Sequence, residues 1–137
     1  SMASVASHLN DQLTAGGNPR LFAGSDGYAD GEQRRDFIHV DDAVAVNLWF
    51  MEHPDRCGIF NVGTGHCQSF NQVAQAVTDW HGRGEVEYIP FPDHLHGCYQ
   101  SYTEADISAL RATGYSAPFM PVEAGVPRYL DWLHRHD

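Results

Sequence analysis

Apolar residues recur along much of the chain at the spacing of helices that bury one face. The clearest stripe lies in residues 73–80, and the Ser-x-x-Gln capping box at Ser69 and Gln72 predicts that this helix begins there. Further helices are expected over residues 3–13, from Asp41 or Asp42 to Glu52, and over 103–114 and 122–133. The helix ending at Glu52 is apolar on nearly all sides, which predicts that it is well buried.

Short apolar runs between these helices predict strands. They cover residues 20–22, 36–40, 58–62 and 85–89, with a polar, glycine-rich loop over residues 24–33. Strands that alternate with helices are typical of an α/β domain. We therefore predict a single domain over residues 1–137, with a small, partly parallel sheet, surrounding helices and space for a larger neighbour.

Charge and composition narrow the functional classes. The 137 residues include 18 acidic and 8 basic residues, giving a formal net charge of −10, and every basic residue is arginine. Such a surface repels nucleic acid and anionic lipid, and the lack of lysine excludes a Schiff base, a P-loop lysine and a Tyr–Lys pair within these residues. No apolar run approaches the roughly 18 residues of a membrane span. The three cysteines form no disulfide framework, which favours the cytoplasm.

Two features suggest phosphate binding, each with a structural alternative. Arg34 and Arg35 follow the glycine-rich loop and could hold a phosphate through bidentate hydrogen bonds, or could pair with Asp30, Glu32 or Asp36 at the surface. The Gly63–Gly65 segment resembles half of a nucleotide loop, but it needs no function beyond a turn. Both alternatives stay open on the residues alone.

Histidines invite a metal or catalytic hypothesis. His94, His96 and Cys98 form the densest cluster, but their spacing matches no common zinc motif, so we expect no metal site. His39 lies among apolar residues, where a structural histidine is favoured over a catalytic one.

Two longer motifs resemble a known superfamily. Residues 35–43 (RDFIHVDDA) and 58–65 (GIFNVGTG) are similar to two signatures of the extended short-chain dehydrogenase/reductases that act on nucleotide sugars. Residues 1–6, 46–50, 87–92 and 110–112 narrow the resemblance to the ADP-L-glycero-D-manno-heptose 6-epimerase family. The similarity runs along the whole chain, which looks like the carboxyl-terminal, substrate-binding domain of such an enzyme without its Rossmann domain.

This resemblance implies an activity for the parent protein. The family interconverts ADP-D-glycero- and ADP-L-glycero-D-manno-heptose at C6 by oxidation and reduction, and so serves lipopolysaccharide core synthesis. It implies a cytoplasmic homo-oligomer in which the missing amino-terminal domain binds NADP. We therefore expect no catalytic, cofactor-binding or metal-binding residue in this chain, which should be inactive alone. We also expect apolar surface at the strand edges and first helix, where that domain would lie.

The resemblance also assigns substrate contacts, residue by residue. They are Ser1, His8, Phe22, Ala23, Gly24, Ser25, Arg35 and Tyr99. Ser1 and His8 approach the sugar and diphosphate, the Phe22–Ser25 segment covers the adenosine, and Arg35 binds the diphosphate. The chain departs from the family at Ala23, where an acidic residue is common, and in a longer loop before Arg35.

Two other functions share part of this pattern. One is a different extended short-chain enzyme, such as a 4-epimerase or a 4,6-dehydratase acting on another nucleotide sugar. The other is a stand-alone module that binds an anionic ligand.

Overall fold

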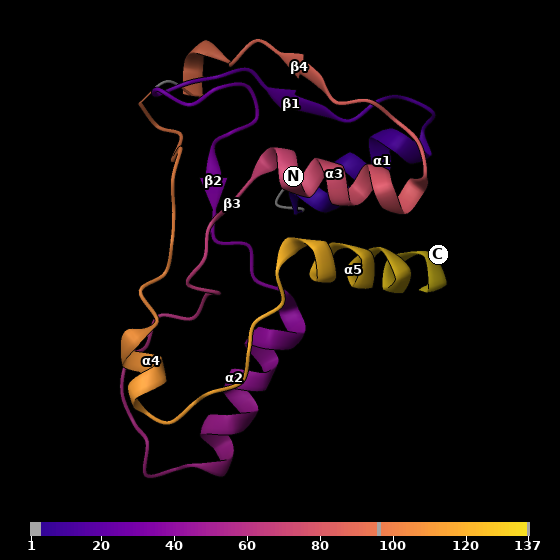
Figure 1. The fold of residues 1–137 in the computed structure, drawn as a ribbon. Coiled ribbons are helices and arrows are strands. Elements are labelled where there is room, and N and C mark those ends of the chain that lie inside the picture. The colour runs from indigo at the N-terminus through magenta and orange to yellow at the C-terminus, as the bar shows by residue number, and fades with distance from the viewer. Residues whose placement is uncertain (1–3, 96, 137) are drawn as a thin grey trace.

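A computed structural model describes residues 4–95 and 97–136. In chain order the elements are α1 (Val5–Thr14), β1 (Arg20–Phe22), β2 (Arg34–Arg35), α2 (Val40–Glu52), β3 (Gln68–Ser69), α3 (Phe70–His81), β4 (Glu87–Ile89), the short 3-10 helix η1 (Asp93–Leu95), α4 (Ser108–Ala112) and α5 (Val122–His136). Figure 1 shows two groups of elements. Helices α1, α3 and α5 lie together beneath β1 and β4, whereas α2 and α4 lie at the other end of the molecule. We call these the three-helix lobe (residues 4–35, 68–95, 97–102 and 122–136) and the α2 lobe (residues 36–67 and 103–121).

The three-helix lobe contains the larger core. Leu9 and Leu13 of α1, Val77 of α3 and Leu130 of α5 are at most 1% exposed and pack in one cluster with Leu21 of β1. Burial of such side chains contributes about 1.5–3 kcal/mol each relative to exposure. The predicted capping box is confirmed, because Ser69 accepts from the amide of Gln72 and the Gln72 side chain accepts from the amide of Ser69. Local capping and apolar spacing therefore agree on where α3 begins.

The fold is α/β and its strand pairing is partly parallel, as predicted. The strands form two separate two-stranded sheets instead of one sheet. Strands β1 and β4 are parallel, with Arg20 opposite Glu87 and Phe22 opposite Ile89. Strands β2 and β3 are antiparallel, and a parallel bridge joins Arg34 to Tyr102. The first pair lies over the three helices, and the second lies at the edge of the three-helix lobe, next to residues 36 and 67 of the α2 lobe.

The predictions for residues 36–40 and 58–62 are wrong, because neither segment forms a strand. The ladder in the first region is shifted to Arg34 and Arg35. His39, rather than Asp41 or Asp42, caps α2, with its Nδ1 accepting from the amide of Asp41 at 3.1 Å. Helix α4 begins only at Ser108. An apolar run in the sequence does not show whether another strand lies beside it to complete the hydrogen bonds of a sheet.

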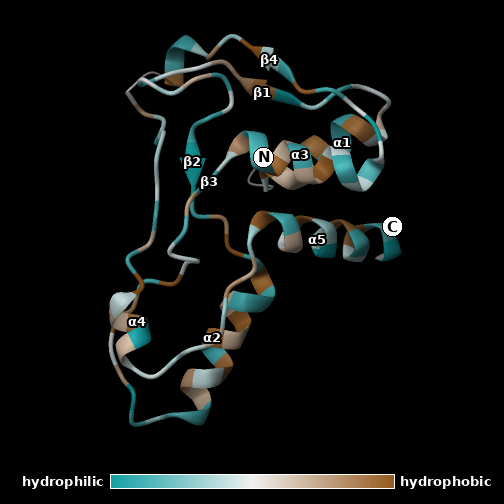
Figure 2. Ribbon diagram, in the orientation of Figure 1, coloured by the Kyte–Doolittle hydropathy of each residue, from teal (hydrophilic) through white to brown (hydrophobic). Residues whose placement is uncertain are grey.

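The predicted burial of α2 is also wrong. Of its residues, Asp42 and Val46 are buried, while Val44, Leu48 and Met51 are 47%, 52% and 76% exposed. Apolar residues recur along α2 in Figure 2. Helix α1, by contrast, buries its apolar face in the core, so the expected exposed apolar surface does not lie on the first helix. Exposed large apolar side chains gather on α2, and on the strands Tyr88 of β4 is 45% exposed.

Candidate functional site

Two neighbouring cavities open beside α1. The α1–β1 cavity has a volume of about 660 Å³ and is lined by His8 of α1, Phe22 of β1 and Tyr99. The α1–α5 cavity has a volume of about 530 Å³ and is lined by Arg35 and by residues of α5. Both cavities are also lined by Val5 and Phe70, so they adjoin along one wall.

An aromatic cluster forms one wall of the α1–β1 cavity. The rings of Phe22, Phe91 and Tyr99 meet edge to face, with centroids 5.4–6.1 Å apart. The Arg35 guanidinium carbon lies 5.0 Å from the Tyr99 ring centroid. Burial raises the pKa of Tyr99 above its ordinary value and the Arg35 cation partly offsets this, so the phenol stays protonated at neutral pH.

Arg35 has an unused hydrogen-bond donor at this wall. Its Nη1 atom is buried and has no partner among the described residues, and Nε of Arg34 is in the same condition. Surface pairing, the alternative left open by the sequence, does not occur in the described part of the chain. Asp30 instead accepts from the amide of Gly24 at 2.7 Å, and Glu32 accepts from Asn71. A buried charged donor without a partner is costly, which favours an anion at Arg35.

The Phe22–Ser25 segment lies at the β1 side of the same cavity. Phe22 lines the cavity, whereas Ser25 is only 8% exposed and its Oγ accepts a hydrogen bond from Gln33. A Cβ atom on Gly24 would collide with the carbonyl oxygen of Tyr28, so only glycine fits there. Ser1 lies outside the described residues.

The structure therefore brings together most of the residues assigned from the sequence. His8, Phe22 and Tyr99 share one cavity, Arg35 contacts Tyr99, and the Ala23–Ser25 segment follows Phe22 directly. Gln33 was not assigned from the sequence, because nothing in the local pattern distinguishes it from other polar residues in the loop.

The Gly63–Gly65 segment is a turn held by a carboxylate. Asp36 accepts from the amides of Thr64, Gly65 and Ala105 at 2.8–3.0 Å and from the Thr64 hydroxyl at 2.6 Å. Burial raises the pKa of Asp36, but the hydrogen bonds from Thr64, Ala105 and Gly65 outweigh it and lower the pKa below its ordinary value. These amides are thus not free for a phosphate.

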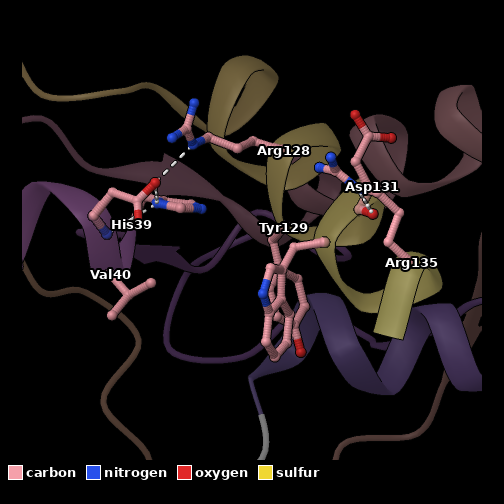
Figure 3. A pocket seen from close by; sticks show the side chains of 8 residues that line it. His39, Val40, Arg128, Tyr129, Asp131 and Arg135 are labelled. Carbon is pink, nitrogen blue, oxygen red and sulfur yellow. Dashed lines mark hydrogen bonds and ion pairs between the residues drawn. The ribbon is translucent and has the colours of Figure 1, made fainter. Parts of the chain in front are cut away.

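A third cavity, of about 480 Å³, lies between the start of α2 and α5 (Figure 3). Its cations already have partners, since Arg128 pairs with Asp41 at 2.7 Å and Arg135 donates to the carbonyl oxygen of Asp131. His39 faces this cavity but uses Nδ1 to cap α2, which supports the structural interpretation of that histidine. This cavity is therefore less suited to bind an anion than the α1–α5 cavity, which Arg35 lines.

Two other features are absent from the described residues, a metal-binding cluster and a membrane-spanning helix. No group of three or more histidine, cysteine or acidic side chains there could hold a metal ion, and His96 lies outside that range. No helix in the described part of the chain is both long and apolar enough to cross a membrane.

Comparison with known proteins adds to this geometry. The profile of the NAD dependent epimerase/dehydratase family matches residues 1–63. ADP-L-glycero-D-manno-heptose-6-epimerase of Alkalilimnicola ehrlichii is 58% identical over 130 residues, which is 95% of this chain and 41% of that protein. The resemblance to the extended short-chain dehydrogenase/reductases is confirmed.

Solved structures of extended short-chain enzymes share the fold. The crystal structure of Helicobacter pylori ADP-L-glycero-D-manno-heptose-6-epimerase matches 98% of this chain and 38% of that protein, with a TM-score of 0.78 and 27% identity. A UDP-N-acetylglucosamine 4-epimerase from Methanobrevibacter ruminantium matches 99% of this chain and 41% of that protein, with a TM-score of 0.79 and 21% identity. This chain thus spans about two-fifths of the length of each of these relatives.

Proposed function

We propose that this chain is the substrate-binding part of an ADP-heptose 6-epimerase, which interconverts ADP-D-glycero- and ADP-L-glycero-D-manno-heptose at C6. The observation that carries the proposal is Arg35, which lines the α1–α5 cavity and whose guanidinium carbon lies 5.0 Å from the Tyr99 ring centroid. Its buried Nη1 has no hydrogen-bond partner among the described residues. The 58% identity to an epimerase of that name supports this substrate over other nucleotide sugars.

The two cavities suggest how an ADP-sugar lies. Its diphosphate would meet Arg35, since a guanidinium can donate to two phosphate oxygens at once. The adenosine would occupy the α1–β1 cavity beside Phe22 and Tyr99, along the Phe22–Ser25 segment. The sugar would extend into the α1–α5 cavity, which Ser4 lines at the start of α1, with His8 near the join.

A second domain would supply the redox chemistry. The relatives are longer than this chain, which spans about two-fifths of their length. We propose that a Rossmann domain binds NADP, carries the catalytic groups, and covers the exposed apolar face of α2 formed by Val40, Val44, Leu48 and Met51. The parent would then be a cytoplasmic homo-oligomer that makes lipopolysaccharide core precursors, and this chain alone would be inactive.

A 4-epimerase is the second candidate, because the fold matches the 4-epimerase of M. ruminantium as well as it matches the H. pylori heptose epimerase. The two candidate functions differ in the nucleoside of the substrate, which is adenosine in one and uridine in the other. An ADP-heptose enzyme should bind ADP more tightly than UDP, and equal or reversed affinities would favour the second candidate.

Calorimetric titration of ADP into the chain tests the assignment of Arg35. Arg35→Ala should weaken binding by roughly 1.5–3 kcal/mol, the scale of a hydrogen bond to a charged group. Arg35→Lys should recover part of the loss, because an ammonium keeps the charge but not the fork.

Arg34→Ala is the matched control, since Arg34 has a similar buried donor but does not contact Tyr99 in this way. If Arg34→Ala weakens ADP binding more than Arg35→Ala does, Arg34 and not Arg35 binds the phosphate. Unchanged affinity in Arg35→Ala would refute it.

A further inference from the structure

Gln33 is a buried polar residue beside the proposed nucleotide site. Its side chain lines the α1–β1 cavity, although the residue is only 2% exposed. Its Nε2 atom donates to the carbonyl oxygen of Ala23 and to Oγ of Ser25, both at 3.1 Å. Its own carbonyl oxygen accepts from the amide of Phe70 at 3.2 Å, which fixes Gln33 to the first turn of α3.

These two bonds hold both ends of a short stretch of backbone. Ala23 and Ser25 lie on either side of Gly24, which has no side chain to anchor it. The amide of Ala23 donates to Ile89 at 2.8 Å, so β4 holds one edge of the segment. The Ala23 carbonyl and the Ser25 hydroxyl are held instead by the single amide of Gln33.

The segment has further connections besides Gln33. The amide of Gly24 donates to Asp30 at 2.7 Å, and the carbonyl oxygen of Ser25 accepts from the amide of Tyr28 at 3.0 Å. Asp26 adopts a left-handed conformation with φ of 54°, and its Oδ2 accepts from the hydroxyl of Ser101 at 2.5 Å. This bond joins the segment to the stretch that carries Tyr99. Residues 22–26 are therefore fixed relative to both the aromatic cluster and α3.

A glutamine amide has two N–H donors, and here both have acceptors in the protein. Gln33 consequently has no donor left for a ligand, and its influence must pass through Ala23 and Ser25. A segment that is already held in its binding shape avoids the entropy cost of ordering when a ligand binds.

We infer that Gln33 is a positioning residue for the nucleoside end of the substrate: it holds the Phe22–Ser25 segment in the shape that receives the nucleoside. This inference rests on the proposed function. Arg35 would bind the phosphates directly, whereas Gln33 would affect nucleoside binding through the Phe22–Ser25 segment. The two residues therefore affect the binding of different parts of one ligand.

Titrations with ADP and with inorganic pyrophosphate separate these roles. Gln33→Met keeps the side-chain length but removes both donors, and should weaken ADP binding about tenfold, as expected for losing buried hydrogen bonds. Its affinity for pyrophosphate should stay within about twofold of the unsubstituted chain, because Arg35 is intact. Arg35→Ala should weaken both ligands. Gln75→Met is the matched control, since Gln75 is exposed on α3 and its side chain donates to the carboxylate of Asp79 on the same helix.

Retained pyrophosphate binding also shows that the variant folds. If Gln33→Met does not fold, Gln33→Asn keeps the amide on a side chain one methylene shorter. It should reach at most one acceptor and show a smaller loss for ADP alone.

Unchanged ADP affinity in the Gln33 variants, or equal losses for ADP and pyrophosphate, would overturn the inference. A different result addresses the proposed function itself. If the unsubstituted chain does not bind ADP, or if Arg35→Ala binds ADP normally, the proposed function fails and the role of Gln33 in it fails too.

Discussion

In the three-helix lobe, Leu9, Leu13 and Leu130 are at most 1% exposed, whereas in the α2 lobe Leu48 and Met51 are 52% and 76% exposed. The small core of the α2 lobe consists of Val46, Leu110 and Tyr115, with Trp49, Phe50 and Phe60 beside it. Helix α2 is more apolar overall than α1, α3 or α5. Yet the described chain covers the apolar faces of α1, α3 and α5, whereas it covers only one side of α2.

This difference shows that apolar content and burial are separate properties. Helices α1, α3 and α5 each present one apolar stripe, and the three stripes meet. The exposed residues Val40, Val44, Leu48 and Met51 also share one face of α2, because they are three or four positions apart. An apolar face of this length is typical of an interaction surface. We interpret it as the place where another domain binds.

Paired leucine substitutions should give the largest difference between the lobes. Leu130→Ala should lower the free energy of unfolding by about 2–5 kcal/mol, because it leaves a cavity in a fully buried site. Leu48→Ala should lower it by less than about 1 kcal/mol, because half of that side chain is already in water. Urea denaturation measures both values. Similar losses at the two positions would contradict the assignment of the core.

Asp36 lies where the lobes meet, and its removal should have an intermediate effect. Asp36→Asn loses acceptors for the amides of Gly65 and Ala105, and should lower the free energy of unfolding at neutral pH by about 1.5–3 kcal/mol. The Gly63 backbone packs closely against the carboxylate, since a Cβ atom on Gly63 would lie 2.6 Å from Oδ2 of Asp36. The side chain at position 36 therefore has little room to move after the substitution.

The same residue predicts a pH dependence. The pKa of Asp36 is lower in the folded state than its ordinary value of 3.8, so the unfolded state takes up this proton first as the pH falls. The contribution of Asp36 is complete above the ordinary pKa and is lost as the pH falls through the folded one. Urea denaturation at a series of pH values should show a shallower acid loss in Asp36→Asn. An unchanged slope would show that Asp36 is not the group responsible.

Charging the α2 face should have the smallest effect on folding but a clear effect on association. We expect the chain to self-associate at high concentration through this face, and Met51→Glu to reduce that association, since the new carboxylate must remain hydrated. The free energy of unfolding should change by less than about 0.5 kcal/mol, because Met51 is 76% exposed.

Sedimentation of the unsubstituted chain and of Met51→Glu measures the change in self-association. Gln75→Glu, on the exposed side of α3, is the control for added charge. A strictly monomeric unsubstituted chain at high concentration would refute the expected association.

Several features of the candidate site could be predicted from the sequence by resemblance. His8, Phe22, Arg35 and Tyr99 were assigned as substrate contacts, and they lie around adjoining cavities. Their individual roles remain proposals. Gln33 could not be found in this way, because its importance depends on Ala23 and Ser25, which come within reach only after the loop folds back.

The sequence by itself determined the elements that depend on neighbouring residues. Helix α3 follows from the Ser69–Gln72 capping box and from apolar positions one turn apart, and both signals act within a few residues. Strand β1 was predicted with its observed bounds, and β4 was predicted at residues 85–89 but begins two residues later, at Glu87. Both are short segments bounded by polar or proline-containing stretches.

Only the tertiary structure decided which segments find partners. Residues 36–40 and 58–62 have strand-like sequences, but a strand needs a hydrogen-bonded neighbour, and the described chain provides none for them. The buried donor of Arg35 likewise could not be predicted, because Asp30, Glu32 and Asp36 are close in sequence but each binds other groups in space. Local patterns act over one or two turns of chain, whereas pairing and burial depend on residues as far as 124 positions apart, as between Asn10 and His134.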